Sequence, residues 1–304
     1  MKKIPLGSGG LALTFPIITQ AYLYANFKII SSVLFSIGII IFIITIINWI
    51  INMKEIMITF KEPERGGFIP TIAMALIIAS SIEYHFYNGN FALCYTLFWI
   101  GVFLFVVLSI IFWVVQLRSF SISKAFPSWY IPSVGIMVVA IAGYNFRIHI
   151  FVFLITYVGY ILFFAVTFVL IKRFLMKGFK FDSIKHSFGV CAAPASLIVL
   201  ASGRYEIFYP VMYVFLVISL IMVIWVYTKI PYILKSAFHP SCASITFPLA
   251  VSCVAIQQVL KHIHSFEIKT ILFGIMGIEI AVASMILLYV LGGYIHWVFK
   301  KNYQ

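Results

Sequence analysis

Long, continuous apolar segments alternate with short polar loops along the whole chain. Runs of about 18 or more apolar residues, the length that spans a bilayer as a helix, recur along the chain, and the segments do not alternate residue by residue as barrel strands do. We therefore predict an all-α polytopic membrane protein with one transmembrane domain, residues 1–304. The ten predicted spans are about 5–26, 29–52, 68–86, 91–116, 129–146, 148–171, 187–203, 207–230, 240–260 and 268–298.

Prolines divide these spans into two alternating kinds. Every odd span carries a proline in its interior or at its entry, whereas the even spans have none in their interiors. Small residues also gather on the odd spans, and the even spans are filled with large apolar side chains, as in 39–51 and 97–115. The prolines of the odd spans are Pro5, Pro16, Pro70, Pro132, Pro194 and Pro248.

This alternation predicts five helical hairpins. A proline inside a helix removes a hydrogen bond and bends the helix, and in lipid such backbone is tolerated only where protein or a cavity surrounds it. Small residues let helices approach closely. We expect an inner ring of five kinked helices around a central pore and an outer ring of five straight helices. The alternative is that Pro and Gly are simply common in membrane helices.

Composition and charge agree with a membrane protein. The chain is 63% hydrophobic and 10% charged, against about 25% charged in soluble proteins. The net charge of +13 would suggest nucleic acid for a soluble domain, but here we expect no nucleic-acid partner, because 16 of the 21 Lys and Arg lie on one side of the predicted spans. This bias predicts that both termini are cytoplasmic. The first apolar segment contains Gly7 and Pro16 and leads directly into another span, so we expect a first helix and not a cleaved leader.

The chain carries no recognisable catalytic motif, and we predict neither an enzyme nor a cofactor. The four cysteines and the scattered histidines lack metal-ligand spacing, so we expect no metal site. The odd spans offer hydroxyl groups instead of charges in their middles, and the candidates for polar groups lining the pore are Ser133, Ser244 and Thr246. Such a lining suits weakly bound anions, since conduction requires release as well as binding.

Two further residues are candidates for function. Phe247 lies beside the helix-bending Pro248 on the most polar of the proline-containing spans, and we interpret it as a pore gate; packing in an apolar core is the alternative. Glu279 lies near the middle of the tenth span, where burying an acid is costly. It is either a titratable site or gate partner, or an acid hydrogen-bonded to a neighbouring helix or at a subunit contact. Its place on an even span favours the structural role.

Four stretches of the chain resemble the tellurite-resistance/dicarboxylate transporter family, which includes the bacterial TehA channel and the plant slow anion channels. The resemblance covers essentially the whole chain, and the motifs of the fifth and ninth spans are its more specific parts. The stretches are 5–13 (PLGSGGLAL), 127–135 (PSWYIPSVG), 189–195 (GVCAAPA) and 246–250 (TFPLA).

The resemblance implies a homotrimer in the cell inner (plasma) membrane with one pore in each subunit. It also implies that a phenylalanine on the ninth helix plugs the pore, and the matching position here is Phe247. We expect an anion channel that passes nitrate and chloride passively. The alternative is a secondary transporter or exporter of dicarboxylates such as malate, or of sulfite or tellurite oxyanions. Such a transporter could be coupled to protons, and Glu279 is then the central titratable candidate.

Overall fold

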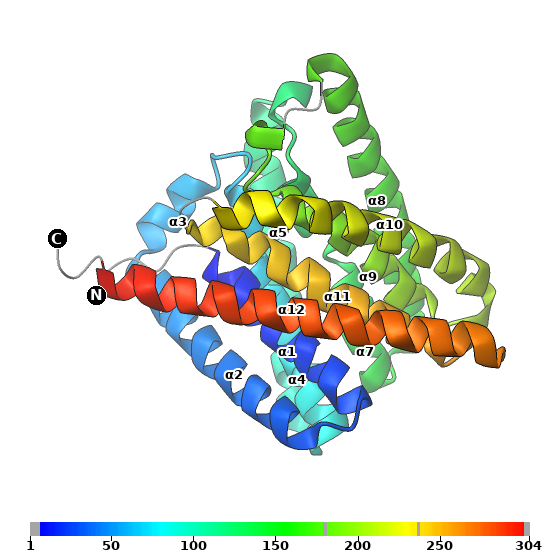
Figure 1. The fold of residues 1–304 in the computed structure, drawn as a ribbon. Helices are drawn as coiled ribbons and strands as arrows, with labels where there is room; N and C mark the ends of the chain where they lie inside the picture. Colours follow the sequence, from blue (N-terminus) through cyan, green and yellow to red (C-terminus); the bar gives the residue numbers. More distant parts are fainter. Residues whose placement is uncertain (1–6, 179–180, 236–237, 301–304) are drawn as a thin grey trace.

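A computed structural model describes residues 7–178, 181–235 and 238–300 (Figure 1). This part of the chain contains α-helices and short 3-10 helices and no strand, so the predicted all-α class is confirmed. Residues 5 and 6 of the first predicted span, with Pro5, lie outside the described residues. The α-helices are α1 (Ser8–Tyr24), α2 (Lys28–Ile51), α3 (Met53–Thr59), α4 (Thr71–Tyr87), α5 (Phe91–Arg118), α6 (Tyr130–Val134), α7 (Met137–Gly143), α8 (His149–Lys177), α9 (Ala193–Ser202), α10 (Tyr209–Lys235), α11 (Ala243–Leu260) and α12 (Phe266–Lys300).

Seven helical segments are long and apolar enough to cross a membrane. The count is eight if α6 and α7, which are bent by 42° relative to each other, form one span. Each of the ten predicted ranges contains helix, but α1 has 17 residues and the segment Phe188–Ser202 is also shorter than a full span. The described helices therefore establish a multi-pass membrane protein, and the count of ten spans stays a prediction.

The prolines lie at different places in their helices. Pro16 and Pro248 lie inside α1 and α11, where each removes a backbone hydrogen bond. Pro70 instead caps α4, and Pro194 lies in the first turn of α9, positions where a helix needs no N–H donor. Pro132 lies in the short helix α6, just before the bend. Among even spans, α10 continues through Pro231 to Lys235, beyond its predicted end.

Burial separates two kinds of helix. In the most apolar window of Pro240–Leu260 every residue is buried, against 22% of the window in Lys28–Ile51 and in His149–Lys177. The exposed side chains of α2 and α8 are mostly Ile, Leu and Phe, such as Ile40 and Phe168. Because lipid tails are as apolar as these side chains, we assign the exposed faces to lipid contact.

The contacts between helices follow a regular order (Figure 1). Each mostly buried helix packs against the exposed helix that follows it in the chain: α1 on α2, α4 on α5, α7 on α8, α9 on α10 and α11 on α12. The buried helices also contact one another in a closed sequence. In order, these contacts are α1 with α4, α4 with α7, α7 with α9, α9 with α11, and α11 with α1.

Glycines on three of the exposed helices permit close approach to the buried ones. A Cβ on Gly38 of α2 would lie 2.6 Å from Cβ of Phe15 in α1, and a Cβ on Gly101 of α5 would lie 2.7 Å from Cγ1 of Ile77 in α4. Gly159 of α8 meets Met137 in the same way. These glycines lie on even spans, where the sequence pattern emphasises bulky residues, so small residues contribute to both partners of each hairpin.

We expect Gly38→Ala to lower the free energy of unfolding by about 1–3 kcal/mol, because Cβ of Phe15 is fixed to the backbone and cannot rotate away. The matched control is Gly274→Ala on α12, where a Cβ meets nothing within 4 Å. Thermal unfolding of both variants in detergent measures the difference. Equal melting temperatures for the two variants would contradict this account of the α1–α2 contact.

Candidate functional site

A cavity of about 540 Å³ lies where the buried helices begin. Its wall includes residues from the first turns of α1, α4, α9 and α11, together with α6, α3 and the loops on that side of the molecule. We call this cavity the vestibule. Because α1, α4, α9 and α11 all present their N-terminal ends here, their dipoles contribute positive potential to the same volume.

Phe247 and Pro248 of α11 lie together in the vestibule wall. Phe247 is 8% exposed, and it lines the vestibule. Pro248 has no N–H, so the carbonyl of Ser244 lacks its usual helical partner four residues on. That carbonyl faces the 3-10 helix Phe188–Ala192, where a Cβ on Gly189 would lie only 2.7 Å from its oxygen. The irregular backbone is thus enclosed by protein.

The vestibule collects some of the residues singled out in the sequence. Pro194, Ser244, Phe247 and Pro248 line it. Ser133 instead donates a hydrogen bond of 2.9 Å to the carbonyl of Trp129 in its own helix. Thr246 joins α11 to α1 through a contact of 2.8 Å between its Oγ1 and that of Thr14. The predicted residues that are not among those lining the vestibule are Pro16, Pro70, Pro132, Ser133, Thr246 and Glu279.

Two histidines in the vestibule were overlooked by the sequence analysis. Nδ1 of His186 lies 2.6 Å from Oγ of Ser241, and Nδ1 of His239 lies 2.7 Å from the same oxygen. The two imidazole centres are 4.6 Å apart. A signal was available in the sequence, because each histidine directly precedes a predicted odd span, the seventh and the ninth.

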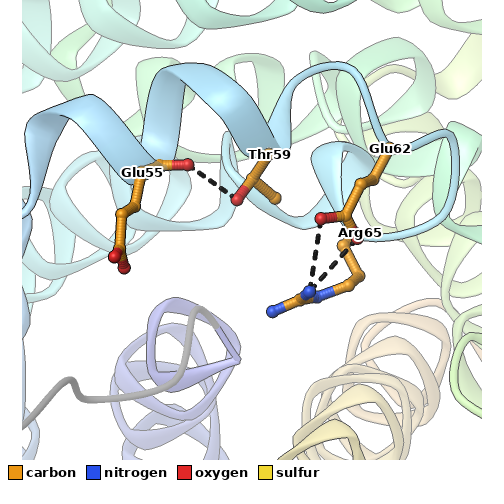
Figure 2. Close-up of polar contacts among 4 residues, drawn as sticks. All are labelled: Glu55, Thr59, Glu62 and Arg65. Atoms are coloured by element: carbon orange, nitrogen blue, oxygen red, sulfur yellow. Dashed lines mark hydrogen bonds and ion pairs between the residues drawn. The ribbon is translucent and has the colours of Figure 1, made fainter.

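The segment containing α3 and the loop after it supplies charged groups to the vestibule. Figure 2 shows Glu55 and Arg65 reaching from this segment, and both line the cavity. Nη1 of Arg65 is 3.2 Å from a carboxylate oxygen of Glu62, an exposed pair of small energetic weight. Oγ1 of Thr59 donates to the carbonyl of Glu55 at 2.9 Å within α3. Glu64 also lines the cavity and accepts a bond of 2.6 Å from Ser187.

The opposite ends of the buried helices carry cations. The guanidinium of Arg204, just after α9, lies 4.8 Å from the ring centre of Tyr144, and burial lowers its pKa. Lys261, just after α11, donates to Oε1 of Gln258 at 3.3 Å, and burial followed by the charge of Arg204 lowers its pKa. The guanidinium of Arg204 keeps its charge at neutral pH, so this end attracts anions.

Glu279 contacts the neighbouring helix α11 and not the vestibule. It is 4% exposed, and its Oε2 lies 2.6 Å from Oγ of Ser252. The same hydroxyl lies 2.9 Å from the carbonyl of Leu249. Because a hydroxyl has one proton, both contacts are satisfied together when the acid itself is protonated and donates to Ser252. This arrangement fastens α12 to α11.

We expect Glu279→Gln to be tolerated, since the amide can donate to Ser252, and Glu279→Ala to lower the free energy of unfolding by about 1–3 kcal/mol. Thermal unfolding in detergent, combined with Ser252→Ala in a double-mutant cycle, measures the coupling of the pair. A coupling energy near zero would rule out the hydrogen bond as the contact that holds these helices.

The apolar helices long enough to cross a membrane, gathered around one cavity, define a multi-pass membrane protein. The chain belongs to the family described as voltage-dependent anion channel (SLAC1), whose model matches residues 3–295. The family resemblance predicted from the sequence is thereby confirmed.

Two relatives from Methanocaldococcus jannaschii share part of the chain. One, named uncharacterized transporter MJ0762, is 31% identical over 189 residues, which are 56% of this chain and 54% of that protein. The other, named uncharacterized transporter MJ0576, is 28% identical over 194 residues, 56% of this chain and 53% of that protein. The chain thus matches about half the length of each relative.

Proposed function

We propose that the protein is a channel through which small anions, of the nitrate and chloride class, pass passively along a path within each subunit. The path runs from the vestibule past Phe247 and between the five buried helices to the end marked by Arg204 and Lys261. The observation that carries the proposal is the position of Phe247, which lines the cavity near the start of the fully buried helix α11 and is itself 8% exposed.

Phe247 acts as a hydrophobic gate in this proposal. An apolar ring in a narrow path excludes hydrated ions until it moves, and the irregular backbone at Pro248 gives this part of α11 room to adjust. The closed sequence of contacts among α1, α4, α7, α9 and α11 supports an inner ring around the path, with α2, α5, α8, α10 and α12 outside it. The positive helix N-termini and the cations at the other end favour anions over cations.

The arrangement in the cell follows from the distribution of basic residues. We propose that both termini and the vestibule face the cytoplasm, because 16 of the 21 Lys and Arg lie in the corresponding loops and ends. The protein would lie in the cell inner membrane as a homotrimer, as the resemblance implies, with each subunit carrying its own path.

The two relatives are named as transporters, which favours a second candidate, a secondary transporter or exporter. Its substrates would be those that the family resemblance implies: dicarboxylates such as malate, or sulfite or tellurite oxyanions. Such a transporter needs a coupling site if protons drive it, and Glu279 is the acid buried within the helices. Its bond to Ser252 gives it a structural task instead, which favours the passive channel.

We expect Phe247→Ala to raise anion conductance at least about ten-fold, because removing the ring opens the hydrophobic constriction. Electrophysiological recording with nitrate, chloride or malate as the bath anion measures the current, and its reversal potential follows the anion gradient. Phe247→Leu keeps apolar bulk and serves as the matched control. Phe103→Ala, on the exposed face of α5, controls for loss of a phenylalanine elsewhere. An unchanged current in Phe247→Ala would refute the gate.

The two candidate functions differ in their response to Glu279→Gln. A passive channel keeps its flux and its pH dependence in this variant, since the amide replaces the acid in the contact with Ser252. A proton-coupled carrier that uses Glu279 loses uphill uptake of labelled malate into proteoliposomes under a pH gradient. Wild-type uphill uptake that disappears in the variant would establish the transporter and exclude the channel.

A further inference from the structure

The two vestibule histidines and Ser241 form a hydrogen-bonded chain with one consistent direction. The backbone N–H of Ser241 donates to Nδ1 of His239 at 3.2 Å, so this nitrogen is an acceptor and the ring carries its proton on Nε2. The Ser241 hydroxyl can then donate to the same nitrogen at 2.7 Å. That leaves Nδ1–H of His186 as the donor to Oγ of Ser241, at 2.6 Å.

This direction makes the two rings unequal as bases. His186 has its Nδ1–H engaged and Nε2 available, so a second proton adds at Nε2 without breaking a bond. Protonating His239 at Nδ1 would instead oppose the N–H and O–H that point at it. Partial burial, then the charges of His186, Arg65 and Lys185, lower the pKa of His239. His186 is therefore the ring whose hydrogen bond to Ser241 stays intact when both of its nitrogens carry a proton.

The charged residues around His186 determine how much one added proton changes the net charge of the vestibule. Apart from the histidines, the acidic and basic residues among the described lining residues are Glu55, Glu64 and Arg65, so the formal charges sum to a negative value while both imidazoles are neutral. Glu64 accepts a hydrogen bond from Ser187, the residue next to His186. Lys185 on the same loop and Tyr130 of α6 are the further titratable groups nearby, and Trp297 of α12 packs on His239. One proton on His186 cancels the negative sum.

We propose that His186 is an anion-binding residue whose protonation admits small anions, carboxylates and oxyanions among them, to the vestibule, and that Ser241 and His239 are the positioning residues that orient its ring. The inference rests on the proposed function only in taking the vestibule as the entrance to the anion path. Proton and anion then bind with positive coupling, because each offsets the charge of the other.

The first experiment measures anion current in the Phe247→Ala background between about pH 5.5 and about pH 8, a range that brackets the ordinary pKa of histidine near 6.5. We expect the current to rise several-fold on acidification. His186→Gln keeps a donor for Ser241 and cannot be protonated, so its current should stay at the alkaline level throughout. His262→Gln, at the opposite end of the molecule, is the matched control and should keep the full response.

His239→Gln tests the positioning role. A neutral amide removes the ring that His186 faces, so the pH midpoint of the current should shift while the response itself remains. If the pH midpoint of the current in His239→Gln equals the midpoint of the Phe247→Ala background, His239 has no positioning role. A full pH response in His186→Gln would overturn the proposal for His186 and leave the channel function standing.

A binding measurement separates this inference from the proposed function. If Phe247→Ala carries no current, the channel is refuted, and nitrate-dependent thermal stabilisation of wild type decides the inference alone. We expect the nitrate Kd of wild type to be roughly ten-fold lower at acidic than at alkaline pH, because a protonated imidazole at His186 attracts the anion. The His186→Gln variant should bind nitrate with the same Kd at acidic and at alkaline pH. Equal nitrate stabilisation of wild type at both pH values would overturn the inference.

Discussion

A carbonyl without a hydrogen-bond donor cannot face lipid, and this constraint explains where α11 lies. Pro248 frees the carbonyl of Ser244, and the 3-10 helix around Gly189 covers it. α11 therefore has to be enclosed on all sides. Its complete burial in the structure agrees with this requirement. The exposed helices α2 and α8 have unbroken backbone hydrogen bonding and large apolar side chains, so they tolerate lipid. The contrast between the enclosed α11 and the lipid-facing α2 and α8 thus begins with backbone chemistry.

Charge is placed at the ends of the enclosed helices and kept out of their middles. At one end, Glu64, Arg65 and the two histidines surround an open volume; at the other, Arg204 and Lys261 lie near each other, with Arg204 against Tyr144. A charge in the middle of such a helix would need a partner or would hold a counter-ion tightly. Groups at the two ends influence which ions approach without trapping them on the way through.

The periodic features of the chain were predictable, and the local geometry was not. Continuous apolar runs located the helices, and the prolines of alternate spans, such as Pro16 and Pro248, marked the buried ones. Both patterns depend only on which residue types occur along the chain, so they can be recognised without the structure. The helix α3 and the contact between His186 and His239 depend on how loops far apart in the chain fold back together. Glu279 was recognisable as unusual, but its partner Ser252 follows only from the packing of α12 on α11.

The size of the vestibule has a consequence for the energetics of permeation. A cavity of about 540 Å³ has room for on the order of twenty water molecules at about 30 Å³ each, so an ion inside it can keep its hydration shell. In the proposed channel, an ion then loses its hydration shell only beyond the vestibule, from Phe247 onward between the packed helices. The vestibule thus shortens the part of the proposed path along which protein groups must replace the water around the ion.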